Sequence, residues 1–201
     1  MDLTPGDDGL LRCSWGTTPE LYRVYHDEEW GRPVTDDIPL FEKLCLEGFQ
    51  SGLSWLTILR KRDSFRSAFA GFDPDAVSLF GEHDVGRLLG DAGIVRHEGK
   101  IRSVINNAKR CLELIEESGS LGAYVWGRAD EEDDPPGQVV TTSPAAIALA
   151  KDLKRRGWIF VGPTTAHAFM QAMGLVNDHL AGCHVREECS RLRRITVKGR
   201  I

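Results

Sequence analysis

Three dipeptides in this chain place a side chain that can cap a helix directly before a proline: Thr18-Pro19, Asp73-Pro74 and Ser143-Pro144. A capping oxygen followed by proline in the first turn is typical of the start of an α-helix. Gly157 and Gly174 stand where helices are expected to end, because glycine readily adopts the left-handed conformation found there. This punctuation predicts a chain that is helical almost throughout.

The apolar residues between these marks recur at helical spacing. One stripe consists of Leu40, Phe41, Leu44, Cys45 and Phe49. A second consists of Ile101, Val104, Ile105, Ala108, Leu112 and Ile115. Residues spaced in this way share one face of a helix and pack against a core. Strand signals are confined to residues 138–142 and 195–197, so we predict an all-α fold in which the two chain ends form a small lobe.

The size and composition of the chain suit one domain. With 201 residues, of which 41% are hydrophobic, it can bury a sizeable core, and we expect a single domain over residues 1–201. No apolar run approaches the ~20 residues that cross a bilayer, and the acidic N-terminus lacks the apolar segment of a signal peptide. We therefore expect a cytoplasmic protein without a membrane partner, in which five cysteines form no disulfide framework.

The formal net charge of −5 argues against a nucleic-acid partner, but the charge is unevenly distributed. Five acids lie within residues 128–137, whereas basic residues gather at 60–62, 96–102 and 151–156. Phosphate contacts need a local basic face and not a basic average. The net charge therefore does not exclude DNA binding.

Residues 84–117 are predicted to form two helices, 84–91 and 98–117, joined by a tight turn at 92–96. Gly93 and Gly99 let a phosphate approach the backbone, and the amides at the start of a helix bind anions. Three basic residues surround this turn: Arg96, Lys100 and Arg102. The pattern fits a helix-hairpin-helix that holds DNA phosphates, and it fits equally a plain helical hairpin with a solvated basic face.

Two Cys/His pairs stand near opposite ends of the chain. His179 and Cys183 are four residues apart, so on a helix they would share a face, and Cys13 and His26 form the other pair. Two thiolates and two imidazoles are a common tetrahedral zinc set, which here would tie the two ends together. The alternative is that the pairs never meet, with His179 capping a helix and Cys183 buried, because their separation matches no zinc-finger spacing.

Two incomplete patterns around these residues indicate other chemistry. His26-Asp27-Glu28 contains the H-x-E of zinc deaminases, but the Pro-Cys-x-x-Cys partner is absent. Gly182-Cys183-His184 resembles the sequence around the acceptor cysteine of alkyl-transfer repair proteins, without its proline. Neither pattern identifies a function.

The segment 46–55 places one carboxylate among apolar residues. Glu47 falls on the apolar side of a helix, where an acid is costly unless it has a partner, and Ser54 would cap a next helix that Trp55 opens. Four more rings lie in the first thirty residues: Trp15, Tyr22, Tyr25 and Trp30. An acid among rings suits a flipped, electron-poor base, although each residue taken singly is more often structural.

Together these segments resemble the 3-methyladenine DNA glycosylase I family. The matching stretches include Arg12-Cys13-Ser14-Trp15, Tyr25-His26-Asp27-Glu28-Glu29-Trp30-Gly31, Leu46-Glu47-Gly48, Gln50-Ser51-Gly52-Leu53-Ser54-Trp55, Asp91-Ala92-Gly93-Ile94-Val95-Arg96-His97 and Asn177-Asp178-His179. The resemblance extends over residues 11–184 and leaves 1–10 and 185–201 as tails. It implies a monomeric DNA repair hydrolase of the helix-hairpin-helix glycosylase fold, which flips 3-methyladenine out of alkylated double-stranded DNA and hydrolyses its N-glycosidic bond.

The resemblance also implies roles for individual residues. Glu47 would be the acid that binds the excised base. The base-binding rings would be Tyr25, Trp55, Trp15, Trp30 and Tyr22. The DNA backbone would contact Gly93, Arg96, Gly99 and Lys100. A structural Zn²⁺ would be held by Cys13, His26, His179 and Cys183.

Two departures and two alternatives accompany the resemblance. His167 stands where a tyrosine is expected beside the pocket, and Ser51 replaces an alanine. A damage-binding module without catalysis would need no Glu47. A bifunctional enzyme would use Lys100 as a Schiff-base nucleophile, for which we prefer a phosphate contact.

Overall fold

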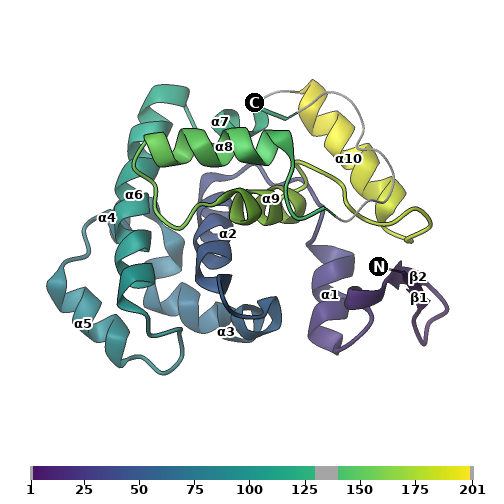
Figure 1. Cartoon of the computed structure of the whole chain (residues 1–201), viewed down its shortest axis with the longest axis horizontal. Helices are drawn as coiled ribbons and strands as arrows, with labels where there is room; N and C mark the ends of the chain where they lie inside the picture. The colour runs from purple at the N-terminus through teal and green to yellow at the C-terminus, as the bar shows by residue number, and fades with distance from the viewer. Residues whose placement is uncertain (1, 130–139, 200–201) are drawn as a thin grey trace.

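The structure, a computed structural model, describes residues 2–129 and 140–199, and helices make up most of this part of the chain (Figure 1). The α-helices are α1 (Glu20–Glu28), α2 (Asp37–Gln50), α3 (Trp55–Ala68), α4 (Pro74–Ser78), α5 (Glu82–Gly90), α6 (Glu98–Ser118), α7 (Leu121–Trp126), α8 (Pro144–Arg155), α9 (Pro163–Ala172) and α10 (Arg186–Lys198). The remaining elements are the 3₁₀ helices η1 (Ser14–Gly16) and η2 (Ala70–Phe72) and the strands β1 (Leu3–Pro5) and β2 (Leu11–Cys13).

The helix boundaries follow the predicted capping residues at most positions. Asp73 and Ser143 accept hydrogen bonds from the backbone amides of Asp75 and Ala146, at the starts of α4 and α8. Ser54 accepts from the amide of Thr57 at the start of α3. Thr18 is the exception, because α1 begins at Glu20 with Pro19 in the capping position and no side-chain cap.

Helix α2 lies at the centre of the fold and carries the first predicted apolar stripe. Leu40, Phe41 and Phe49 are buried, and α2 packs against α3, α6, α7 and α9. Helix α6 carries the second stripe, and α5 and α6 form the predicted pair of helices to within two residues. These contacts fix the position of every side chain on the inward face of α2, including Glu47.

Both predicted strand segments differ from the structure. Residues 195–197 belong to α10, where Val197 joins the main core and Ile195 faces solvent, so packing outweighs the strand preference of β-branched residues. Residues 138–139 lie outside the described residues, and 140–142 form no strand. The sheet that does form pairs β1 with β2 in antiparallel register, Leu3 opposite Cys13, and the sequence analysis missed it.

The small sheet at the N-terminus contacts the loop before α10, where the amide of His184 donates to the carbonyl of Leu11, so the predicted lobe forms in part. Figure 1 shows α1, α10 and the small sheet together at one side of the molecule. A second buried cluster links Cys13 of β2 to Leu180, Cys183, Val185 and Cys189. No helix in the described part of the chain is long and apolar enough to cross a membrane.

Candidate functional site

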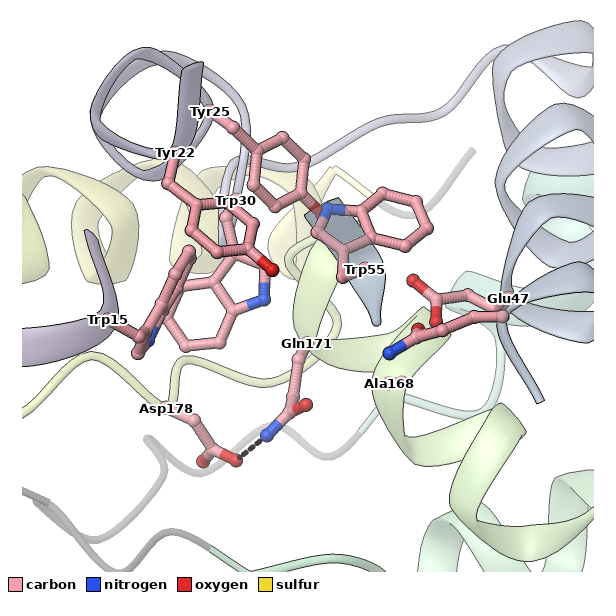
Figure 2. A pocket seen from close by; sticks show the side chains of 10 residues that line it. Trp15, Tyr22, Tyr25, Trp30, Glu47, Trp55, Ala168, Gln171 and Asp178 are labelled. Atoms are coloured by element: carbon pink, nitrogen blue, oxygen red, sulfur yellow. Dashed lines mark hydrogen bonds between the residues drawn. The ribbon is translucent and has the colours of Figure 1, made fainter. Parts of the chain in front are cut away.

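A pocket of about 250 Å³ opens between α1, the α2–α3 junction and α9 (Figure 2). It is lined by Trp15, Tyr22, Tyr25, Trp30, Glu47, Gln50, Trp55, Ala168, Gln171 and Asp178. All five rings that the sequence suggested for base binding, together with the predicted acid, therefore meet in one place.

The rings pack edge to face and form a rigid wall. Trp15 lies 5.0 Å from Trp30 and 5.8 Å from Tyr22 between ring centroids, with interplanar angles of 85° in both pairs. Tyr25 and Trp55 lie 5.5 Å apart at 45°. The hydroxyl of Tyr22 accepts a hydrogen bond from the amide of Leu56 at 2.8 Å, which ties α1 to the start of α3. Such a wall suits a flat ring that stacks on aromatic faces.

Glu47 projects from α2 into this pocket and is only 6% exposed. Its carboxylate makes no hydrogen bond or ion pair with any residue that the structure describes. Burial raises the pKa of Glu47 above its usual range, and the charge of Lys43 opposes that rise. An acid placed in this way is ready to bind a polar group of a ligand.

Several residues of the pocket were missed by the sequence analysis. Gln171 on α9 donates a hydrogen bond from Nε2 to Asp178 Oδ2 at 2.6 Å, and both line the wall opposite the rings. Gln50 lies one turn after Glu47 on α2. A glutamine or aspartate in a helical sequence carries no signal of its own. Only the convergence of α2 with α9 and the loop that follows it brings these side chains to one cavity.

His167 is buried beside the pocket, but it is not among the lining residues. Its Nε2 lies 3.3 Å from Asp178 Oδ2, so it contacts the acid that Gln171 also binds. The departure from the family pattern at this position therefore affects the support of the wall and not the surface that a ligand would meet.

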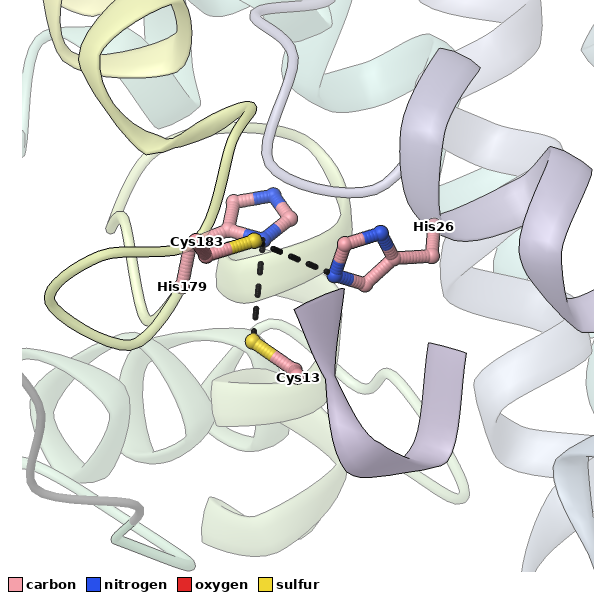
Figure 3. Close-up of side chains that lie close together, drawn as sticks. All are labelled: Cys13, His26, His179 and Cys183. Carbon is pink, nitrogen blue, oxygen red and sulfur yellow. Dashed lines mark hydrogen bonds between the residues drawn. The ribbon is translucent and has the colours of Figure 1, made fainter. Parts of the chain in front are cut away.

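Behind the pocket, the two predicted Cys/His pairs come together (Figure 3). Cys183 Sγ lies 3.5 Å from His26 Nε2 and 3.6 Å from His179 Nδ1. Cys13 Sγ lies 3.9 Å from His179 Nδ1, and the four donor atoms all lie within 4.8 Å of one another. The alternative in which the two pairs never meet is therefore wrong.

His179 and Cys183 do not lie on a helix, because residues 177–184 form a loop between α9 and α10. The amide of Cys183 donates to the carbonyl of Leu180, and Gly182 adopts the left-handed conformation with a φ of +91°. This turn returns Cys183 to the same side as His179. The two side chains are therefore as close as their spacing would make them on a helix, but a turn of the loop brings them together.

The second nitrogen of each imidazole has its own partner. His26 Nδ1 lies 2.8 Å from Asp27 Oδ1, and His179 Nε2 lies 3.0 Å from the carbonyl oxygen of Trp30. Both partners are acceptors, so each of these nitrogens carries the proton and the other nitrogen presents a lone pair to the cluster. With two thiols beside them, this closed set of four buried donors can hold a metal ion.

The turn between α5 and α6 is only partly as predicted. Gly93, Arg96 and Gly99 lie at the surface, and the side chain of Arg96 has no ion-pair partner among the described residues. Lys100 is buried instead, and its ammonium donates to the carbonyls of Phe49 and Ser51 at 2.9 and 2.6 Å, at the end of α2. Arg102 forms ion pairs with Glu82 and Glu98.

Comparisons with known proteins agree with this geometry. A family model described as methyladenine glycosylase matches residues 15–187. The chain is 46% identical over 179 residues to DNA-3-methyladenine glycosylase 1 of Escherichia coli (strain K12), an alignment covering 87% of this chain and 96% of that protein. It is 41% identical over 177 residues to DNA-3-methyladenine glycosylase of Haemophilus influenzae, covering 86% of this chain and 96% of that protein.

Solved structures give the same result. A crystal structure of 3-methyladenine DNA glycosylase I matches with a TM-score of 0.81 at 47% identity, over 86% of this chain and 98% of that chain. The Staphylococcus aureus enzyme, studied for its recognition of 3-methyladenine, matches with a TM-score of 0.83 at 35% identity, over 87% and 96% of the two chains. The fold and the site define a helical protein with a pocket of aromatic rings and one buried acid. The chain belongs to the methyladenine glycosylase family.

Proposed function

We propose that this protein is a DNA repair hydrolase that excises 3-methyladenine from alkylated double-stranded DNA. The observation that carries the proposal is the carboxylate of Glu47, which faces a pocket of five rings without a hydrogen-bond partner among the described residues. The relatives named above are 3-methyladenine glycosylases that align over most of the chain.

The chemistry follows from the charge of the damaged base. An N3-methylated adenine is cationic while it is attached to deoxyribose, so its glycosidic bond is already weakened. Once flipped out of the duplex, the base would stack between rings such as Tyr25 and Trp55, and Glu47 would attract its positive charge. Neutral adenine gains less from both interactions, so the pocket selects the damaged base and favours its departure, after which water adds to the sugar carbon.

We infer that the enzyme is monofunctional. A Schiff-base nucleophile needs a free amine beside the sugar. The amine of Lys100 is instead buried and donates to two carbonyls at the end of α2, where it joins α6 to the pocket segment. In this position Lys100 supports the DNA-binding surface indirectly.

We infer further that the Cys/His cluster holds a structural Zn²⁺. The donor set of Cys13, His26, His179 and Cys183 is closed, so bound zinc would stabilise the fold and leave no position for substrate or water. The rings of Trp15 and Trp30 pack against His26 and His179, with centroids 5.1 and 4.5 Å apart. The zinc ligands would thereby hold one wall of the base pocket in place.

The test of the proposed function is release of bases from N-methylated duplex DNA, measured by chromatography under single-turnover conditions. The native protein should release 3-methyladenine, and Glu47→Gln should lower the rate by roughly 100-fold while DNA affinity is retained. Glu116→Gln, at an exposed acid of α6, serves as the control and should leave the rate unchanged. Tight binding of damaged DNA by the native protein without release would instead identify a damage-binding module.

We also propose that the turn between α5 and α6 is a helix-hairpin-helix that contacts the DNA backbone through Gly93, Gly99 and Arg96. The amides of Glu98 and Gly99 at the start of α6 have no acceptor among the described residues and suit a phosphate, whereas the amide of Lys100 already donates to the capping His97. Arg96→Ala should weaken binding to all sequences and reduce the salt dependence of the affinity by about one unit of slope. Arg102→Ala is the matched control, because Arg102 is already paired with Glu82 and Glu98.

A further inference from the structure

Lys43 is a lysine in a position that lysine rarely occupies. It lies one turn before Glu47 on α2 and is 6% exposed. A buried ammonium loses its hydration and the freedom of a long side chain, so it is stable only where other groups compensate. The compensating groups of Lys43 all belong to the base pocket or its surroundings.

The ammonium of Lys43 contacts two rings of the pocket wall, those of Tyr25 and Trp55. Lys43 Nζ donates a hydrogen bond to the hydroxyl oxygen of Tyr25 at 2.8 Å. It also lies 4.1 Å from the ring centroid of Trp55 and 4.6 Å from that of Tyr25, within the range of cation–π attraction. Lys43 itself does not line the pocket, so its charge sits behind the wall that a ligand would touch.

One of the acids around Lys43 forms no ion pair with a described cation. Glu47, Glu29, Arg62 and Glu42 are the groups whose charges act on it. Glu29 forms an ion pair with Arg62, and Glu42 forms one with Arg66 on α3. Among these acids, Glu47 is the one that no described cation contacts directly, and it is also the one that faces the ligand.

We propose that Lys43 is a positioning residue of the base pocket, which keeps Glu47 in its carboxylate form and holds the ring of Tyr25 in the pocket wall. This inference rests on the proposed function, because it assigns to Lys43 the task of preparing the two groups that would meet the base. Lys43 does not line the pocket, so it would act on a ligand only through Glu47 and Tyr25.

The effect of Lys43 on the charge of Glu47 follows from the surroundings of the Glu47 carboxyl group. Burial favours the neutral acid and raises the pKa of Glu47, and the positive charge of Lys43 lowers it again. A neutral acid would offer no negative charge to a cationic base, and one of its oxygens would carry a proton. Without Lys43, the pocket would therefore lose its charge at a higher pH.

The effect of Lys43 on Tyr25 follows from the hydrogen bond between Lys43 Nζ and the Tyr25 hydroxyl. A lysine ammonium can only donate, so the Tyr25 oxygen is the acceptor and its own proton remains available. No described residue accepts that proton. The hydrogen bond therefore fixes the position of the Tyr25 ring in the pocket wall.

The direct test is the titration of the Glu47 carboxyl carbon by ¹³C NMR in the full-length, zinc-loaded protein, with Glu47→Gln used to assign the signal. Lys43→Met should raise the midpoint of Glu47 by about 1–3 pH units, because the opposing charge is removed. Lys43→Arg should keep the midpoint near that of the native protein. Equal midpoints in Lys43→Met and the native protein would overturn the proposal.

The other titratable groups near the pocket are Tyr22, Tyr25, Asp178 and the neighbouring His167, and they are unchanged in these variants. Lys43→Gln separates the two roles, because it keeps a donor for Tyr25 without the charge, and it also carries the test if the methionine variant fails to fold. Its Glu47 midpoint should rise as in Lys43→Met.

Excision provides the second readout. In Lys43→Met, the acidic limb of the single-turnover rate should move to higher pH by the same amount as the carboxyl midpoint, with affinity for undamaged DNA unchanged. A purely structural role would lower the rate equally at every pH and would overturn the proposal. The carboxyl titration needs no activity, so a failure of the proposed function would leave that result interpretable.

Discussion

The base pocket and the Cys/His cluster share a wall, but their buried polar groups differ in whether they have hydrogen-bond partners. Trp30 packs on His179 on one side and lines the pocket on the other. In the cluster, both nitrogens of His26 and of His179 have partners or face the thiols. In the pocket, the carboxylate of Glu47 is buried and has no partner among the described residues.

This difference separates a group that stabilises the fold from one that binds a ligand. A buried polar group with its hydrogen bonds made is compatible with stability, whereas one without them costs free energy of folding. The chain itself supplies all four donors of the Cys/His cluster, and a metal ion is all that the cluster would take from outside. The pocket is complete only when a base supplies the missing partners, so the two regions should respond oppositely to substitution.

Cys183→Ser should have the largest effect, because it removes one of four donors from the closed site. We expect loss of bound zinc and a fall in the free energy of unfolding of about 5 kcal/mol or more, a fraction of what a structural zinc site can contribute. Metal analysis of the purified protein and denaturation by urea would measure both quantities.

Cys189→Ser is the matched control for this substitution. Cys189 is buried in the same small cluster as Cys183 but is not one of the four donors. It should cost no more than about 2 kcal/mol and leave the zinc content unchanged. Full zinc content in Cys183→Ser would show that the cluster is not a zinc site, and the contrast with the pocket would fail.

The pocket should respond in the opposite direction. Lys43 and Glu47 are two buried charges without a direct ion pair between them, so replacing both by uncharged groups of similar size should remove a desolvation cost, by about 1–4 kcal/mol. The double variant Lys43→Met/Glu47→Gln should therefore unfold at a higher urea concentration than the native protein at neutral pH while losing excision activity. Lys43→Met alone should be less stable than the double variant, because it leaves Glu47 buried without an opposing charge.

The sequence predicts the role of a residue where that residue lies in a recognisable motif, and does not where the role depends on contacts between distant segments. The rings of the pocket and the four Cys/His donors are predicted because they lie in long motifs that resemble one family. Lys43 is not predicted, because a lysine within an amphipathic helix is ordinarily solvated. Its burial arises only when Tyr25 from α1 and Trp55 from α3 close over α2.

The error at residues 195–197 has the same origin. The β-branched residues 195–197 indicate a strand, but an amphipathic helix lets Val197 pack against the main core. The spacing of His179 and Cys183 would place both on one face of a helix, but a loop with a left-handed Gly182 brings them together instead. For residues 195–197 a contact distant in sequence decided the conformation, and no local pattern contains that contact.

Asp27→Asn should sharpen the comparison with a smaller effect, because Asp27 acts on the cluster without donating to it. Its carboxylate holds His26 through Nδ1 at 2.8 Å and also binds Arg12 and His184. The amide that replaces it is a weaker acceptor without charge, so His26 becomes a poorer ligand, and zinc affinity should fall by about 10-fold. Competition with a chelator would measure this. Asp8→Asn is the control, since Asp8 binds the same Arg12 without reaching His26. An equal loss in both variants would mean that the ion pairs of Arg12, and not the orientation of His26, set the stability of the closed site.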